Sequence, residues 1–169
     1  MAIDSTVQKT PAMVLRGIRQ LRIAAFLLGF GLGGFIDAIA LHMILQWHHI
    51  ISNLVPMDTL AGLQINVWGD GIFSAGMWLI TVIGLGLLWN ALKQNPILPL
   101  STQAFIGWIV VGWGGFNTFD SIVFHAILKL HHIRQVPNFL VYDISFFILG
   151  LLLIAIGFWL TREKSSGVS

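Results

Sequence analysis

The residues of this sequence that can transfer protons or bind metal ions lie in two short stretches, 37–50 and 120–133. The stretches are duplicates, because each acid and histidine of the first recurs 83 positions later in the second. All six histidines of the chain belong to them, and two further acids, Asp70 and Asp143, follow at matching places, each three residues before a Phe. An Asp in a membrane helix costs roughly 2.5–3.5 kcal/mol. Retention of these groups in both copies therefore indicates a function rather than packing alone.

The chemistry that fits these residues is metal binding. The chain has no cysteine, which excludes thiolate ligands, cysteine nucleophiles and disulfides. Imidazole combined with carboxylate suits Cu(II), Zn or non-haem Fe, and a pair such as His42 and His125 could instead hold a haem through its axial positions. We expect the metal ligands to be His42, His48, His49, His125, His131 and His132, with Asp37, Asp70, Asp120 and Asp143 as ligands or as acceptors that orient the imidazoles.

The spacing of these residues limits how a regular helix could present them. At roughly 100° and 1.5 Å per residue, His42 and His49 share a face but stand about 10 Å apart. Asp37 and His48 share a different face, and no two of these residues are three or four positions apart. One continuous helix therefore cannot chelate an ion, and we predict that ligands converge from several helices. His42 is expected opposite His125, and His49 or His48 opposite His132 or His131. These angles and distances do not apply to His48 and His49 if the helix ends before them.

The segments that must position these residues are hydrophobic. Apolar residues make up 56% of the 169 residues and charged residues only 9%, against about a quarter charged in soluble domains. Apolar segments at 23–51, 67–92, 104–130 and 139–161 each exceed the ~20 residues that a membrane-spanning helix needs. We predict an all-α integral membrane protein with four transmembrane helices in a lipid bilayer. The nine Lys and Arg residues form no dense patch, which argues against nucleic acid as a partner.

The duplication predicts how the helices are arranged. Residues 23–92 and 104–161 each form a two-helix repeat, and the two parallel repeats are expected to be related by a pseudo-twofold axis normal to the membrane. Small residues in the first and third helices are typical of close helix packing; they are Gly29, Gly33, Gly34, Gly112, Gly114 and Gly115.

The basic residues predict the orientation in the membrane. Seven of the nine lie in the N-terminal segment 1–22, the loop 93–103 and the tail 162–169, and only Lys129 and Arg134 lie in the opposite loops. The excess places both termini in the cytoplasm. The histidine cluster is then expected within the bundle towards the extracytoplasmic side.

The duplicated motif resembles that of a known family. The string from Gly34 through Asp37 and His42 to His49, and its second copy ending at Arg134, resembles a bacterial family of small predicted membrane proteins, domain-of-unknown-function family 2243. The resemblance covers nearly the whole chain after residue 22. It implies a multi-pass, four-span protein of the bacterial cell membrane and no particular activity. The family pattern leads us to expect a His in place of Ser74 and a Glu in place of Asp120, so a ligand from the second helix would be missing here.

The leading hypothesis for function is a metal or haem site in a four-helix bundle, with a redox or metal-handling role. Two other classes stay open. Asp37 and Asp120 at mid-depth, with histidines above them, could form a proton or cation pathway. Alternatively, the chain could be an accessory or assembly subunit of a larger membrane complex, or a homo-oligomer, in which the cluster is structural. The sequence assigns no catalytic residue and leaves open whether the chain is an enzyme.

Overall fold

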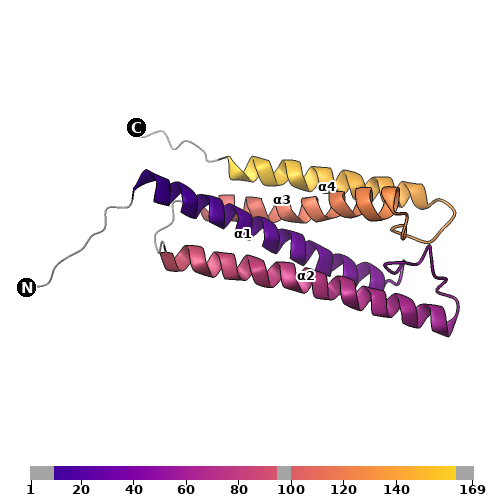
Figure 1. Ribbon diagram of the computed structural model, residues 1–169. Coiled ribbons are helices and arrows are strands. Elements are labelled where there is room, and N and C mark those ends of the chain that lie inside the picture. The colour runs from indigo at the N-terminus through magenta and orange to yellow at the C-terminus, as the bar shows by residue number, and fades with distance from the viewer. Residues whose placement is uncertain (1–9, 95–99, 163–169) are drawn as a thin grey trace, which may run out of the picture.

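The computed structural model describes residues 10–94 and 100–162 and folds them into four long helices (Figure 1). They are α1 (Pro11–Asp37), α2 (Leu60–Gln94), α3 (Thr102–Asp120) and α4 (Phe139–Thr161). α1 continues into a π-helical segment, η1 (Ala38–Ile44), and α3 continues into a second one, η2 (Ser121–Ile127). The predictions for residues 1–9, 95–99 and 163–169, including Lys9 and Lys164, lie outside the described residues.

The prediction of an all-helical chain is confirmed, but the helix boundaries differ from those expected. α1 begins at Pro11, which suits the first position of a helix because its missing N–H would be unpaired there anyway. Hydropathy marks only the apolar part of this helix, from residue 23. The helix of α1 and η1 ends at Ile44 rather than near 51, since Gln46 adopts a φ of 49° in the left-handed region. Lys129, its counterpart in the second copy, has a φ of 50° and follows η2 in the same way.

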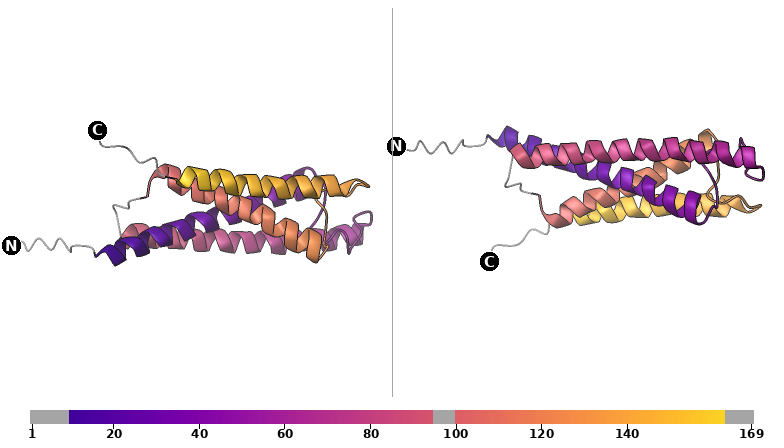
Figure 2. Two further views of the ribbon diagram at one scale, coloured as in Figure 1. Left: turned by 90° about the horizontal axis from the view of Figure 1, so that it is seen from above. Right: turned by 90° about the horizontal axis from the view of Figure 1, so that it is seen from below.

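The two inner helices are α1 and α3, which cross each other between α2 and α4 (Figure 2). Glycine allows this close crossing. A Cβ at Gly29 would lie 1.8 Å from the carbonyl oxygen of Ile109, and one at Gly112 would lie 2.0 Å from that of Phe26. Among the described residues, the Cα atoms of α1 and α4, and those of α2 and α3, nowhere come within 8 Å of each other. Phe73 of α2 reaches Phe116 of α3 through its ring alone, with the centroids 6.0 Å apart. The bundle is therefore held together through its two crossing helices.

The outer surface of the bundle is apolar. Among the described residues, three helices are long and apolar enough to cross a membrane: Pro11–Ile44, Leu60–Gln94 and Phe139–Thr161. α3 is not among them; it is rich in glycine and carries Asn117 and Asp120. Large side chains such as Trp68, Trp89 and Leu152 are exposed on α2 and α4. Such faces fit contact with lipid rather than water.

The loops 45–59 and 128–138 lie at the same end of the bundle and are joined by hydrogen bonds (Figure 1). The amide of Asn53 donates to the carbonyl of Leu130 at 2.9 Å, and the amide of Gln135 donates to the carbonyl of Trp47 at 3.2 Å. The Gln135 side chain also donates to Ser52 and Asn53. These bonds tie the two halves of the chain together just outside the histidine residues.

Candidate metal centre

The π-helical segments bring an acid and a histidine together in each half. Residues five apart do not share a face of an α-helix, but hydrogen bonds from i to i+5 widen the turn and bring them into line. In η1, the Asp37 carboxylate lies 3.2 Å from Nε2 of His42. In η2, the Asp120 carboxylate lies 2.9 Å from Nε2 of His125. π-helical turns are frequent at functional sites.

A third residue joins each pair after the helix has ended. The left-handed residue Gln46 turns the chain back, so that His48 is fully buried against η1. His131 is placed in the same way after Lys129. The first triad is Asp37, His42 and His48, and the second triad is Asp120, His125 and His131. In each triad, one donor atom per residue lies within 4.8 Å of the other two, as ligands of one metal ion would.

The two triads are in direct contact through their third members. The rings of His48 and His131 stack with their centroids 4.5 Å apart and their planes 3° apart. His42 lies 4.3 Å from His48, and His125 lies 4.6 Å from His131, centroid to centroid. The four imidazoles thus form one compact cluster around the stacked pair, since His42 also lies 6.0 Å from His131 and His125 lies 6.5 Å from His48.

Backbone carbonyls fix which nitrogen of the stacked histidines is free. Nδ1 of His48 donates to the carbonyl of Ile133 at 2.9 Å, and Nδ1 of His131 donates to the carbonyl of Ile50 at 3.0 Å. A carbonyl only accepts, so the proton sits on Nδ1 and the Nε2 lone pair can bind a metal. Both residues follow the helices, and desolvation by burial lowers their pKa, that of His131 to about 4. Both rings are therefore neutral near pH 7, as metal ligands must be.

The two remaining acids orient histidines instead of completing a triad. The Asp70 carboxylate on α2 accepts from Nδ1 of His42 at 2.7 Å, from Nδ1 of His49 and from the Ile50 amide at 2.8 Å. Carboxylates that hold the second nitrogen of a ligating histidine fix its tautomer and its ring orientation. His49 is held by this acid and lies outside the first triad.

Asp143 on α4 has the corresponding partners in the second half. It lies 3.2 Å from Nδ1 of His125 and accepts from Nδ1 of His132 at 2.7 Å and from the Ile133 amide at 2.9 Å. His132 is partly exposed and lies outside the second triad. Each partner of Asp70 thus corresponds to a partner of Asp143 that lies 83 positions later in the chain. Asp143 itself lies only 73 positions after Asp70, because the second loop is shorter.

The donor atoms of the triads are buried and lack hydrogen-bond partners among the described residues. They include Nε2 of all four triad histidines and at least one carboxylate oxygen of each acid: His42, His48, His125, His131, Asp37 and Asp120. A buried polar atom without a partner costs about 1–3 kcal/mol, so a set of them facing one another needs a physical reason. Bound metal ions would satisfy all of them together.

The structure brings together the ten residues singled out in the sequence, but the residues that contact one another differ in part from those expected. His48 and His131 face each other, which was one of the expected pairings. His42 and His125, also expected to face each other, are separated by this stacked pair. Each triad comes from one chain segment instead of several helices, because the π-helical turn and the chain reversal remove the limits of a regular helix. Ser74 lies one turn after Asp70, and its buried hydroxyl has no partner among the described residues.

Sequence reasoning missed the carbonyls of Ile50 and Ile133 that orient the stacked histidines. Every residue has a backbone carbonyl, so the sequence cannot indicate which carbonyl accepts a hydrogen bond from a histidine.

The comparisons with known proteins bear on the family alone. A family model described as "Predicted membrane protein (DUF2243)" matches residues 24–164. No curated protein and no solved structure matches the chain.

Proposed function

Because this chain belongs to the family of predicted membrane proteins DUF2243, we propose that it is a membrane metalloprotein that binds two transition-metal ions, one in each triad. The observation that carries the proposal is the pair of buried triads whose unpartnered donor atoms converge within 4.8 Å. The Nδ1 contacts to carbonyls and carboxylates support it, since they leave each Nε2 directed towards the ion.

The donor set favours a reactive centre over a structural one. Two histidines and one carboxylate are the ligands of non-haem Fe(II) sites that keep open positions for substrate. Structural zinc sites are closed by four protein ligands, whereas catalytic ones use three. Each triad supplies three. We therefore favour iron in a redox role, with copper and zinc as the competing ions.

The arrangement of the rings favours ions over haem. A haem shared by His42 and His125 would have to stand between them, where the stacked rings of His48 and His131 lie. Rings stacked at 4.5 Å with parallel planes leave no space for a macrocycle between them.

The membrane arrangement that we propose has four spans and both termini in the cytoplasm. α3 with η2 is long enough to cross ~30 Å of hydrocarbon at ~1.5 Å per residue. Arg16, Arg19 and Arg22 at one end of the bundle outnumber Lys129 and Arg134 at the other. The matched contacts of the two triads support a pseudo-twofold axis normal to the membrane. The metal centre would then lie near the extracytoplasmic side.

The proposal is tested by metal analysis of the full chain, purified in detergent without chelators and supplemented separately with Fe(II), Cu(II) and Zn(II). Elemental analysis should find two ions per chain, and the double variant His48→Ala with His131→Ala should bind none. The variant Gln94→Ala, at an exposed position, controls for the effects of substitution and should bind as the wild type does. A wild-type protein that retains none of the three metals after supplementation would refute the function.

A proton pathway is the second candidate, and one observation favours it. Asp70, His42 and Asp37 form an unbroken line of buried ionisable groups, with contacts of 2.7 and 3.2 Å. Intramembrane acids and histidines in sequence are typical of proton relays. Proton flux into liposomes containing the metal-free protein would support this reading, and its loss in Asp37→Asn would assign the path.

A further inference from the structure

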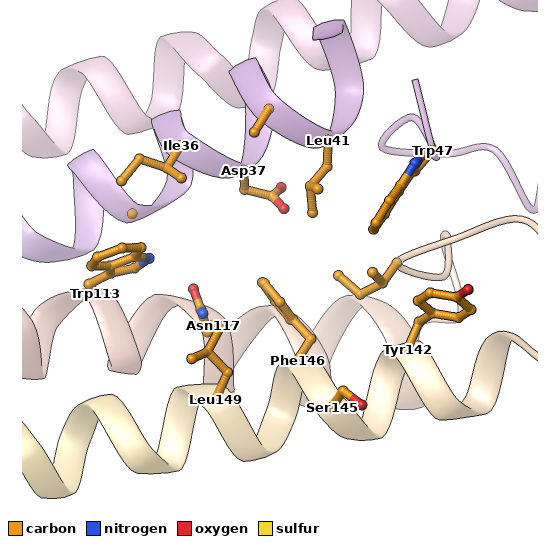
Figure 3. A pocket seen from close by; sticks show the side chains of 13 residues that line it. Ile36, Asp37, Leu41, Trp47, Trp113, Asn117, Tyr142, Ser145, Phe146 and Leu149 are labelled. Atoms are coloured by element: carbon orange, nitrogen blue, oxygen red, sulfur yellow. The ribbon is translucent and has the colours of Figure 1, made fainter. Parts of the chain in front are cut away.

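An open cavity of about 330 Å³ lies beside the first triad (Figure 3). Its walls come from α1 and η1, from α3 and from α4, and they are mostly apolar. The main apolar contributors are Ile36, Leu41, Trp113, Ile133, Phe146 and Leu149. Figure 3 shows the Asp37 carboxylate directed into this space between Leu41 and Asn117. A ligand in the cavity would therefore lie against a residue of the first triad.

The position of the cavity between helices gives it access from the side of the bundle. It occupies the space between α1 and α4, whose Cα atoms nowhere come within 8 Å of each other in the described part of the chain. In the proposed membrane arrangement, this side faces the bilayer. An apolar molecule could enter from the lipid without crossing water.

A cation, Arg134, lies against two aromatic residues of the cavity wall, Trp47 and Tyr142, although it does not itself line the cavity. Trp47 and Tyr142 lie at one end of the cavity and Trp113 at the other, with Asp37 between them (Figure 3). The Arg134 guanidinium lies 5.0 Å from the Trp47 ring and 5.4 Å from the Tyr142 ring, and it donates to the Tyr142 hydroxyl at 2.9 Å. Among the described residues, no carboxylate pairs with Arg134, so its other donors are free for an anion.

The corresponding place in the second half is filled by aromatic rings. Ile36 and Leu41 on the cavity wall correspond to Phe119 and Phe124, 83 positions later. Those two rings pack edge to face at 5.6 Å, and Phe30 packs against Phe119 at 5.9 Å. A second cavity borders η2, but the acid that lines it is Asp143 and not the triad acid Asp120. The first cavity thus reaches its triad at the acid Asp37, whereas the second, of about 560 Å³, reaches its triad at His125.

We propose that this cavity binds a fatty acid, with its carboxylate at Arg134 and its alkyl chain lying past Asp37 towards Trp113. The inference rests on the proposed function, since it makes a long-chain acid the ligand presented to the ion of the first triad. The charge of Arg134 selects an anionic head, and the apolar walls select a hydrocarbon chain. The volume, near the lower end for small-molecule sites, suits one chain rather than a two-chain phospholipid.

The binding is tested with doxyl-labelled stearic acid added to the metal-loaded full chain in nanodiscs of phosphatidylcholine. The spin spectrum should show a saturable immobilised component of one molecule per chain. The methyl ester of the same probe lacks the charge and should bind about tenfold more weakly. A labelled phosphatidic acid should show no saturable component. Binding of the ester as tight as that of the acid, or saturable binding of the phospholipid, would overturn the assignment.

Variants locate the site. Ile36→Phe with Leu41→Phe places in the first half the side chains that the second half already has, and it should remove the immobilised component while both metal ions stay bound. Ile39→Phe adds the same ring at an exposed position of η1 outside the cavity and should bind as the wild type does. Arg134→Gln should weaken binding about tenfold, whereas Lys129→Gln, at the same end, should not.

Two results would refute the inference: no saturable component in the wild type, or unchanged binding in both the filled variant and Arg134→Gln. Metal content measured on the same samples separates the two proposals. Saturable binding of the acid to a wild-type protein that takes up no metal would refute the proposed function while supporting the cavity as a fatty-acid site.

Discussion

His48 and His131 are stacked with parallel rings, and each is oriented by the opposite half of the chain: His48 by the carbonyl of Ile133 and His131 by that of Ile50. The two bonds form a reciprocal exchange across the centre of the molecule. Each triad therefore depends on the half of the chain that contributes none of its ligands.

This exchange predicts a large effect for a single substitution. His48→Ala removes a proposed ligand from the first triad and leaves the buried carbonyl of Ile133 without its donor, which costs about 1–3 kcal/mol. We expect one metal ion per chain instead of two, and a lower melting temperature of the metal-free protein in detergent. Gln135→Ala, which removes only exposed hydrogen bonds to Ser52 and Asn53, should change the melting temperature little. Equal effects of the two variants would contradict this account.

A second prediction concerns Asp70, which holds His42, His49 and the Ile50 amide. Asp70→Asn keeps the shape of the side chain but loses its charge and one acceptor oxygen, so the ring of His42 is no longer held in one orientation. Substitution of a residue that orients a ligand typically lowers metal affinity 10–100-fold. Competition titration with a chelator should show that loss at one of the two sites only. Asp58→Asn, in the exposed loop, is the control and should leave both affinities unchanged.

The glycines at the helix crossing give a third prediction. A Cβ at Gly29 would clash with the backbone of Ile109, which cannot move without displacing α3. Gly29→Ala should therefore destabilise the protein by about 1–3 kcal/mol, seen as a lower melting temperature. A Cβ at Gly86 meets nothing within 4 Å, so Gly86→Ala should be neutral or slightly stabilising. A Gly29→Ala protein as stable as Gly86→Ala would argue against the close crossing.

The fourth prediction tests the membrane arrangement. Reporter fusions at Leu60 and Val136 should lie outside the cytoplasm, and a fusion at Leu100 should lie inside, because the basic residues favour that orientation. Alkaline phosphatase and green fluorescent protein give opposite signals on the two sides and serve as mutual controls. A cytoplasmic signal at Val136 would exclude four spans with both termini inside.

The sequence was sufficient to predict the helical class and to single out the ionisable residues that the fold gathers, because such residues in apolar segments are rare enough to stand out. It could not predict how those residues combine. The hydrophobic pattern is the same for an α-helical and a π-helical turn, so nothing indicated that Asp37 and His42 would meet. The left-handed conformation of Gln46 is equally hidden, since a Gln is not typical of that region. The second apolar segment was expected from residue 67, but α2 begins at Leu60, because Gln64 and Asn66 interrupt the hydrophobic run without ending the helix.

The reciprocal bonds of His48 and His131 also set an order of events during biogenesis. A first hairpin that has just entered the membrane holds Asp37 and His42 close together, but its His48 has no carbonyl to fix its tautomer until the second hairpin arrives. An ion that reached the first hairpin alone would meet all three residues of the first triad, but His48 would lack the carbonyl of Ile133 that orients its ring. If the triads bind metal as proposed, stable loading would follow the docking of the two hairpins, so that a loaded centre would mark a fully assembled chain.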